Sequence, residues 1–383
     1  MPTSVFIQSQ KEFESVAEYL NGLDAFSIDT EFDNNHYAYG FTLCLIQIAT
    51  SERCFLIDPF EVKDMSSLWR ILENPDIEKV LHDCGEDMRL FYLHDCFPKN
   101  IFDTSVAVKL LNYERIGLGS VLDEVLGIAF SKQKQQSNWL KRPLVPKQLE
   151  YAANDVIHLL ALRDALTEQL KEQNRWEWFC QSQEFLERKN FAPKIKDTFL
   201  STKQQKEFGP FDQYVLNELY RFRDQQAKRI GKPVYQVITE GVIQDVYHNP
   251  NLLIDWANLK GVHYKIQHPL IVTQIKEVIN NATAVAEKLG LLHEKQTLTG
   301  QQRNELNWSN TRLNTLRNDV FVPIKRQIEQ QHGLLLTPYL LSNEMINILL
   351  TEDAKLSDIC PLFQQQIIKE AAVAIGVDIS AFY

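Results

Sequence analysis

Two acidic residues, Asp29 and Glu31, are separated by a single residue, and this spacing is the first sign of chemistry in the chain. Residues 27–32 alternate as a strand does, so both carboxylates project from one face and Thr30 projects from the other. Neighbouring acids repel each other and resist burial unless a cation compensates them. Because Mg²⁺ and Mn²⁺ prefer oxygen ligands, the pair is a candidate metal site. The alternative is a solvent-facing pair at a strand end.

Further acids occur in similar settings later in the chain. Residues 79–84 read as a second strand, which breaks at Gly85 and leads into a helix over 86–93 with Asp87 in its first turn. A carboxylate there is favoured by the helix dipole and lies near a strand end, a common site position in α/β proteins. A third helix begins at Pro146, where a missing N–H costs nothing, and carries Tyr151 and Asp155 on one face.

In this order, the motifs resemble the DEDDy class of 3′→5′ exonucleases, and the segments between them resemble the ribonuclease D family. The matching segments are Leu45 to Ile48, Leu56 to Pro59, Val80 to Asp87, Asp103-Thr104, Asn138 to Leu144 and Glu150 to Val156. The resemblance is strong up to about residue 190 and weaker beyond it. It implies a ribonuclease H-like α/β domain with a mixed sheet flanked by helices.

The resemblance also implies a role for each residue of the acid set and for the tyrosine. Two divalent ions, Mg²⁺ or Mn²⁺, about 3.5–4 Å apart would activate water and stabilise the leaving 3′ oxygen. Asp29 would bridge them, Glu31 and Asp155 would hold the ion on the nucleophile side, and Asp87 would bind the second ion. Tyr151 would orient the attacking water, since an ordinary pKa near 10 makes tyrosine a poor base. Taken alone, it could equally be a helix tyrosine that covers the core.

Substrate contacts are predicted at three further residues of this region, each with a structural alternative. His82 precedes the second motif and could contact substrate or serve only the structure. Trp139 and Arg142 lie in the loop before the helix that begins at Pro146. Trp139 could stack on a terminal base or pack the loop, and Arg142 could hold a phosphate. Residues 33–40 depart from the pattern of many bacterial ribonucleases D, and this leaves a preference for RNA open.

A polar stretch over 194–207 reads as a linker into a helical region. The following segment includes an amphipathic helix over 214–229 with basic residues on its polar face, and it resembles the HRDC domain, which implies nucleic-acid binding. We assign Arg221, Arg223 and Lys228 as candidate contacts; the alternative is a packing module with an ordinary charged face. A faint repeat after residue 326 resembles a second, divergent HRDC-like domain. We therefore predict an exonuclease domain over 1–192 and all-α domains over 208–285 and 295–383.

Whole-chain composition sets limits on compartment and partners. The net charge of −10 predicts that basic residues are locally concentrated if the chain binds nucleic acid. Six cysteines without paired spacing read as reduced thiols, and the start of the chain lacks the pattern of a signal peptide. No apolar run reaches membrane-spanning length. We therefore expect a cytoplasmic monomer without a membrane partner.

The function predicted from these features is metal-dependent 3′→5′ exonucleolysis of RNA that releases nucleoside 5′-monophosphates. The expected partner is RNA with a single-stranded 3′ end, above all tRNA precursors. A 3′→5′ DNA exonuclease of the repair or proofreading type shares the acid set and stays open, because 2′-OH recognition is not legible from the sequence. A non-catalytic nucleic-acid-binding scaffold ranks last, because all four acids and the tyrosine are present.

Overall fold

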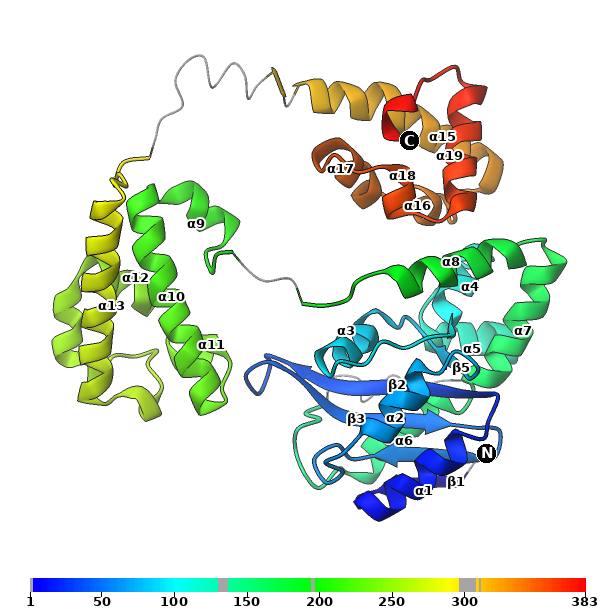
Figure 1. Cartoon of the computed structure of the whole chain (residues 1–383), viewed down its shortest axis with the longest axis horizontal. Helices are drawn as coiled ribbons and strands as arrows, with labels where there is room; N and C mark the ends of the chain where they lie inside the picture. Colours follow the sequence, from blue (N-terminus) through cyan, green and yellow to red (C-terminus); the bar gives the residue numbers. More distant parts are fainter. Residues whose placement is uncertain (1–2, 130–136, 194–196, 296–307, 310) are drawn as a thin grey trace. The chain divides into compact units, whose positions relative to one another are not determined.

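The computed structural model describes residues 3–129, 137–193, 197–295, 308–309 and 311–383 (Figure 1). The chain divides into two compact units. Unit 1 consists of Met1–Glu31, Leu43–Pro193 and Gln302–Tyr383, and unit 2 consists of Phe32–Thr42 and Lys194–Gln301. The three predicted domain ranges stay predictions, and each unit is described here by itself.

A six-stranded sheet forms the centre of the first part of unit 1. Its strands are β1 (Thr3–Ile7), β2 (Ala25–Asn34), β3 (Phe41–Ala49), β4 (Arg53–Ile57), β5 (Glu78–Leu81) and β6 (Ile101–Asp103), in the order β1-β4-β3-β2-β5-β6. β1 is parallel to β4, β5 is parallel to both β2 and β6, and β3 is antiparallel to β4. The predicted mixed sheet is therefore confirmed. Most of β3 and β4 is buried, as expected of apolar central strands.

The connections between and after the strands form the helices of this part of unit 1 (Figure 1). They are α1 (Gln10–Leu20), α2 (Ser66–Glu73), α3 (Gly85–Leu93), α4 (Thr104–Leu110), α5 (Leu118–Leu126), α6 (Pro146–Val156), α7 (Leu159–Glu172) and α8 (Trp176–Arg188). Apolar residues of α6, including Ala152 and Val156, share one core with Leu45 of β3 and Leu56 of β4. The hydroxyl of buried Ser27 donates to the carbonyl of Val156 at 2.9 Å and so fixes the end of α6 to β2. Sheet and helix are thus packed where the predicted acids lie.

The C-terminal part of unit 1 is helical and packs on α8 (Figure 1). Its elements are η3 (Arg317–Phe321), α15 (Val322–His332), α16 (Thr337–Leu340), α17 (Asn343–Thr351), α18 (Leu356–Ile359), α19 (Leu362–Ala374) and η4 (Ser380–Phe382). Trp178 stacks on Phe363 with ring centroids 5.2 Å apart, and the Tyr339 hydroxyl donates to Ser182 Oγ at 2.9 Å. A continuous apolar core joins these helices to α4–α8. The helical character predicted for this region is confirmed, while its HRDC identity stays a prediction.

Unit 2 is a helical body that also includes the turn segment, residues 32–42, between the body of β2 and that of β3. Its helices are α9 (Thr202–Glu207), α10 (Pro210–Ile230), α11 (Val234–Val237), α12 (Glu240–His248), η1 (Pro250–Asn258), η2 (Tyr264–Ile266) and α13 (Pro269–Lys288). α9 lies within the stretch predicted as a linker, so that prediction is wrong over 202–207; Ser201 caps this helix by accepting from Gln204 N. Tyr39 of the turn segment donates its hydroxyl to Asp224 of α10 at 2.8 Å.

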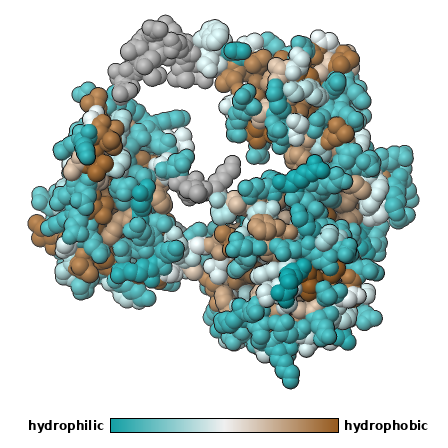
Figure 2. All heavy atoms as spheres, viewed as in Figure 1, coloured by the Kyte–Doolittle hydropathy of each residue, from teal (hydrophilic) through white to brown (hydrophobic). Residues whose placement is uncertain are grey.

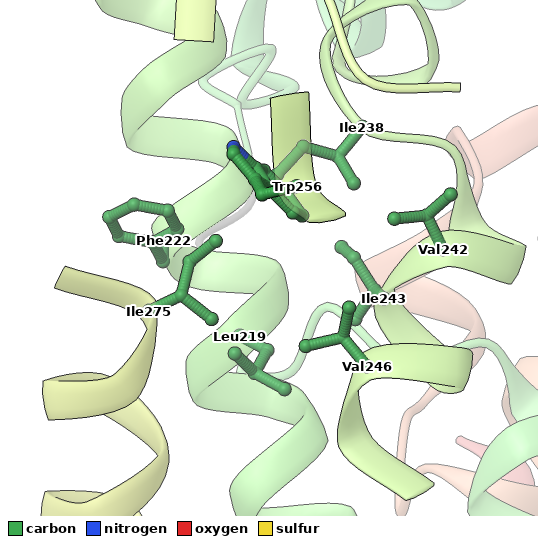
Figure 3. Close-up of a pocket in the computed structure, with 8 residues that line it drawn as sticks. All are labelled: Leu219, Phe222, Ile238, Val242, Ile243, Val246, Trp256 and Ile275. Atoms are coloured by element: carbon green, nitrogen blue, oxygen red, sulfur yellow. The ribbon is translucent and has the colours of Figure 1, made fainter. Parts of the chain in front are cut away.

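The core of unit 2 closes around a small apolar pocket, whose lining residues come from α10, α12, α13, η1 and the segment between α11 and α12 (Figure 3). Trp256 lies in this core, and its indole N–H donates to the carbonyl of Ile266 at 2.8 Å.

Figure 2 shows a mostly hydrophilic surface on the viewed face, with scattered hydrophobic patches. Among the described residues, no helix combines the length and the apolarity needed to cross a bilayer.

Candidate active site

Three of the predicted acids lie together in unit 1. Asp29 and Glu31 come from β2 and Asp155 comes from α6, and one carboxylate oxygen from each lies within 4.8 Å of the others. The period-two alternation of β2 places Ser27, Asp29 and Glu31 on one face, and Ser27 is the residue that bonds the end of α6. This contact explains why Asp155, far away in sequence, meets the strand acids.

The fourth acid, Asp87, approaches from α3 and is buried, with 6 % of its surface exposed. The turn before α3 contains Asp83 in the left-handed region (φ 59°), and it is held by Asp103. The Asp103 carboxylate accepts from the backbone N–H of Asp83 at 2.9 Å and of Cys84 at 3.2 Å. Asp87 Oδ1 itself accepts a hydrogen bond from Thr30 Oγ1 at 2.5 Å. The acid is therefore fixed both through its backbone turn and through its side chain.

Burial raises the pKa of all four carboxyl groups, and the charge of neighbouring acids adds to this effect at Asp29, Glu31 and Asp87. The pKa of Asp29 rises through burial and then through the charge of Asp155, and the pKa of Glu31 rises through burial and then through Asp29. Burial followed by the charge of Asp29 raises the pKa of Asp87. Burial raises the pKa of Asp155 to about 7. Such a cluster resists ionisation without a cation, and a divalent ion would restore the charged forms.

Tyr151 lies one helical turn before Asp155 on α6, and its hydroxyl is hydrogen-bonded to that carboxylate. Burial and the charges of Asp155, Glu31 and Asp29 raise the pKa of the phenol well above its ordinary value. The hydroxyl consequently stays protonated at neutral pH and can act as a donor or orienting group, but not as a base. The Trp139 ring lies against this tyrosine, with ring centroids 6.2 Å apart.

The two residues predicted in the loop before α6 have structural partners. The Arg142 guanidinium makes two hydrogen bonds to Asp58, from Nε at 2.7 Å and from Nη2 at 2.8 Å. It also donates to the carbonyls of Cys44 and Trp139, each at 2.7 Å. Trp139 is only 3 % exposed, so the alternative of packing the loop describes it better than base stacking does. Contact of either residue with nucleic acid stays a prediction.

The remaining predicted contacts are divided between the two units. His82 Nδ1 lies 2.8 Å from Thr104 Oγ1. Burial lowers the pKa of the His82 imidazole, which favours the neutral ring. In unit 2, Arg221 and Lys228 are exposed on α10, and Arg221 is paired with Glu218 at 3.4 Å. Arg223 lies over the Tyr220 ring, 4.6 Å from its centroid. Arg221 and Lys228 thus present charge to solvent, whereas Arg223 is partly committed to packing.

Sequence reasoning missed Thr30, Asp103 and Asp58 as residues that hold the site. Each acts on a partner distant in sequence, and the local pattern carries no signal of that pairing.

Residues 4–171 match the family model described as 3′-5′ exonuclease, so this part of the chain is similar to 3′-5′ exonuclease domains. The resemblance to ribonuclease D inferred from the sequence is confirmed by relatives of that name. The chain is 34 % identical to ribonuclease D of Xanthomonas oryzae pv. oryzae over 231 residues, which cover 60 % of this chain and 63 % of the relative. It is 33 % identical to ribonuclease D of Pseudomonas paraeruginosa over 243 residues, which cover 62 % of this chain and 64 % of the relative. The chain thus matches less than two thirds of the length of these relatives.

Solved structures extend the likeness in fold to nearly the whole chain. Escherichia coli RNase D matches with a TM-score of 0.70 at 22 % identity, covering 97 % of this chain and 98 % of that one. The catalytic core of RRP6 from Trypanosoma brucei matches with a TM-score of 0.63 at 22 % identity, covering 75 % of this chain and 81 % of that one. At this identity the matches establish the fold alone.

Proposed function

We propose that this protein is a metal-dependent 3′→5′ exoribonuclease that releases nucleoside 5′-monophosphates from a single-stranded 3′ end. The observation that carries the proposal is the cluster of Asp29, Glu31 and Asp155, in which one carboxylate oxygen from each lies within 4.8 Å of the others. The Tyr151 hydroxyl is hydrogen-bonded to Asp155. It lies within the segment that matches the 3′-5′ exonuclease family. The ribonuclease D name of the curated relatives supports RNA as the substrate.

The donor set fits divalent metal ions. The cluster offers only carboxylate oxygens, which are ligands for hard ions such as Mg²⁺ and Mn²⁺, and its members need positive charge in order to ionise together. Asp29, Glu31 and Asp155 would hold one ion, and Asp29 with Asp87 would hold a second. Bound there, the ions would lower the pKa of water and stabilise charge on the leaving oxygen.

The chain's own residues contribute orientation and charge. The Tyr151 hydroxyl stays protonated beside Asp155 and can fix the position of the attacking water. Asp155 accepts a hydrogen bond from that hydroxyl. Its own position is fixed by the packing of α6 on the sheet. Water is thus oriented by groups that do not need to move during the reaction, which is an effective way to lower a barrier.

For the physiological substrate we propose RNA with a single-stranded 3′ tail, of which tRNA precursors are the first example to test. The exposed Arg221 and Lys228 of α10 are the basic side chains that we assign to backbone phosphates. A cytoplasmic monomer remains our prediction. A 3′→5′ DNA exonuclease is the second candidate, because the same acid set would hydrolyse either backbone.

The test uses a 3′-extended tRNA precursor and a single-stranded DNA of matched sequence, each labelled at its 5′ end. Both are incubated with the protein in Mg²⁺, in Mn²⁺ and in EDTA. The proposal predicts a metal-dependent ladder that shortens from the 3′ end, faster on RNA, with nucleoside 5′-monophosphates as products. Faster shortening of the DNA would favour the second candidate. Binding without shortening in either metal would refute both.

A further inference from the structure

Asp87 differs from the other three acids in how it is held. Asp29, Glu31 and Asp155 form a compact group by themselves, and Asp87 is not a member of it. Its carboxylate lies close enough to Asp29 for the charge of Asp29 to disfavour its ionisation. An aspartate on a helix has several rotamers available, so its backbone position alone does not keep this carboxylate facing the group. A separate contact is needed to keep it facing the cluster.

Thr30 supplies that contact. It lies on β2 between Asp29 and Glu31, and its hydroxyl donates to Asp87 Oδ1 at 2.5 Å. Both side chains are buried, with 5 % of Thr30 and 6 % of Asp87 exposed, so water competes little for the bond. A β-branched side chain on a strand is restricted in χ1, which makes the direction of this hydroxyl well defined. The strand that carries two of the acids thus also positions the acid of α3.

The backbone before Asp87 is held independently. Asp103 accepts hydrogen bonds from Asp83 N and Cys84 N, and it also caps α4 through Ser105 N at 2.8 Å. This network fixes where α3 begins but does not set the direction of the Asp87 carboxylate. The Thr30 hydroxyl can therefore be removed by substitution while Asp103 still holds the turn before α3.

We propose that Thr30 is a positioning residue for the second metal ion: its hydroxyl holds the Asp87 carboxylate in the direction that ion binding requires. One hydrogen bond to Oδ1 leaves further lone pairs of the carboxylate for an ion. The inference rests on the proposed function for the identity of the two ion positions. Valine has the shape of threonine without the hydroxyl, so Thr30→Val removes the hydrogen bond and little else. Thr30→Ser keeps a hydroxyl.

The test is a titration of the full-length, metal-free chain with Mn²⁺ alone, with free Mn²⁺ followed by electron paramagnetic resonance. Asp87→Asn serves as the reference for loss of the second ion. Thr337→Val is the matched control, because Thr337 is an equally buried threonine whose hydroxyl donates to the carbonyl of Gly333, in the C-terminal helical part. Circular dichroism melting checks that each variant is folded. If Thr30→Val does not fold, Thr30→Ala removes the same hydroxyl and takes its place.

We expect the unsubstituted chain to bind two Mn²⁺ ions. Thr30→Val should weaken the second by about tenfold, equivalent to about 1.4 kcal/mol, and leave the first unchanged. Thr30→Ser should stay within about threefold of the unsubstituted chain, and Thr337→Val should not differ from it. Unaltered binding by Thr30→Val, equal losses in Thr30→Ser and Thr30→Val, or a single Mn²⁺ in the unsubstituted chain would each overturn the inference. If this binding pattern is found but RNA is not shortened, the proposed function fails while the role of Thr30 stands.

Discussion

Replacing Asp155 by asparagine should stabilise the metal-free protein while abolishing its turnover. Burial raises the pKa of this carboxyl from 3.8 to about 7, so the folded protein holds the proton more tightly than the unfolded chain does. For an acid whose pKa is raised on folding, stability is lost as the pH rises from the unfolded value through the folded one. The ionised carboxylate is therefore a cost above pH 7, and an amide of nearly the same shape carries no such cost.

The magnitude follows from the two pKa values. The difference between the folded and unfolded pKa values is worth about 4 kcal/mol at pH 8, about 2 kcal/mol at pH 5 and less than about 1 kcal/mol at pH 4. The full difference is an upper limit, because relaxation and entering water partly solvate a buried carboxylate, whereas the hydrogen bond from Tyr151 is already included in the pKa of about 7. We expect a net stabilisation of about 1–3 kcal/mol at pH 8 that disappears at pH 4.

The assay is urea unfolding in EDTA at pH 8 and pH 4, followed by circular dichroism. Asp123→Asn is the control, because Asp123 is an exposed acid on α5 outside the cluster, and its replacement should change stability by less than about 0.5 kcal/mol. The reasoning is refuted if Asp155→Asn destabilises the protein at pH 8 by more than about 1 kcal/mol, or if its effect is the same at both pH values.

Three further predictions concern the same site. Tyr151→Phe should lower the single-turnover rate by about 10²-fold and leave RNA affinity within about threefold, because it removes an orienting hydroxyl; an equal loss of affinity would make Tyr151 a binding contact. Arg142→Lys should destabilise the protein by about 2–4 kcal/mol in urea unfolding, since lysine cannot make the paired hydrogen bonds to buried Asp58; unchanged stability with weaker RNA binding would instead support the phosphate contact. Because protons compete with metal at Asp155, the Mg²⁺ concentration for half-maximal rate should rise by up to about tenfold per pH unit below pH 7. A half-maximal Mg²⁺ concentration that is the same at pH 7 and pH 5 would contradict this.

Local patterns predicted the elements that carry the acids. The alternation around Asp29 predicted a strand over 27–32, and β2 extends over Ala25–Asn34. Pro146 marked the start of α6, because proline is favoured at the first helical position. The second strand, predicted over 79–84, extends three residues beyond the end of β5 at Leu81, and Asp83 has a positive φ. That conformation is stabilised by hydrogen bonds that Asp103 accepts from the backbone N–H groups of Asp83 and Cys84, and the local sequence does not reveal them.

Contacts between distant segments could not be predicted in the same way. The pairing of Arg142 with Asp58 joins residues 84 positions apart, and the bond from Thr30 to Asp87 joins residues 57 positions apart. The alternation of β2 assigned Thr30 to the face away from the carboxylates, and it could not show that a fourth acid would be tied to that residue. The packing of the C-terminal helices on α8 likewise depends on a core shared with distant helices.

Shortening of a 5′-labelled, 3′-extended tRNA precursor, compared between the unsubstituted chain and Asp155→Asn, tests the central claim most directly. The account predicts a ladder from the 3′ end in Mg²⁺ or Mn²⁺, no ladder in EDTA, and no ladder with the folded variant in any metal. RNA shortening that persists in EDTA, or a variant as active as the unsubstituted chain, would contradict it.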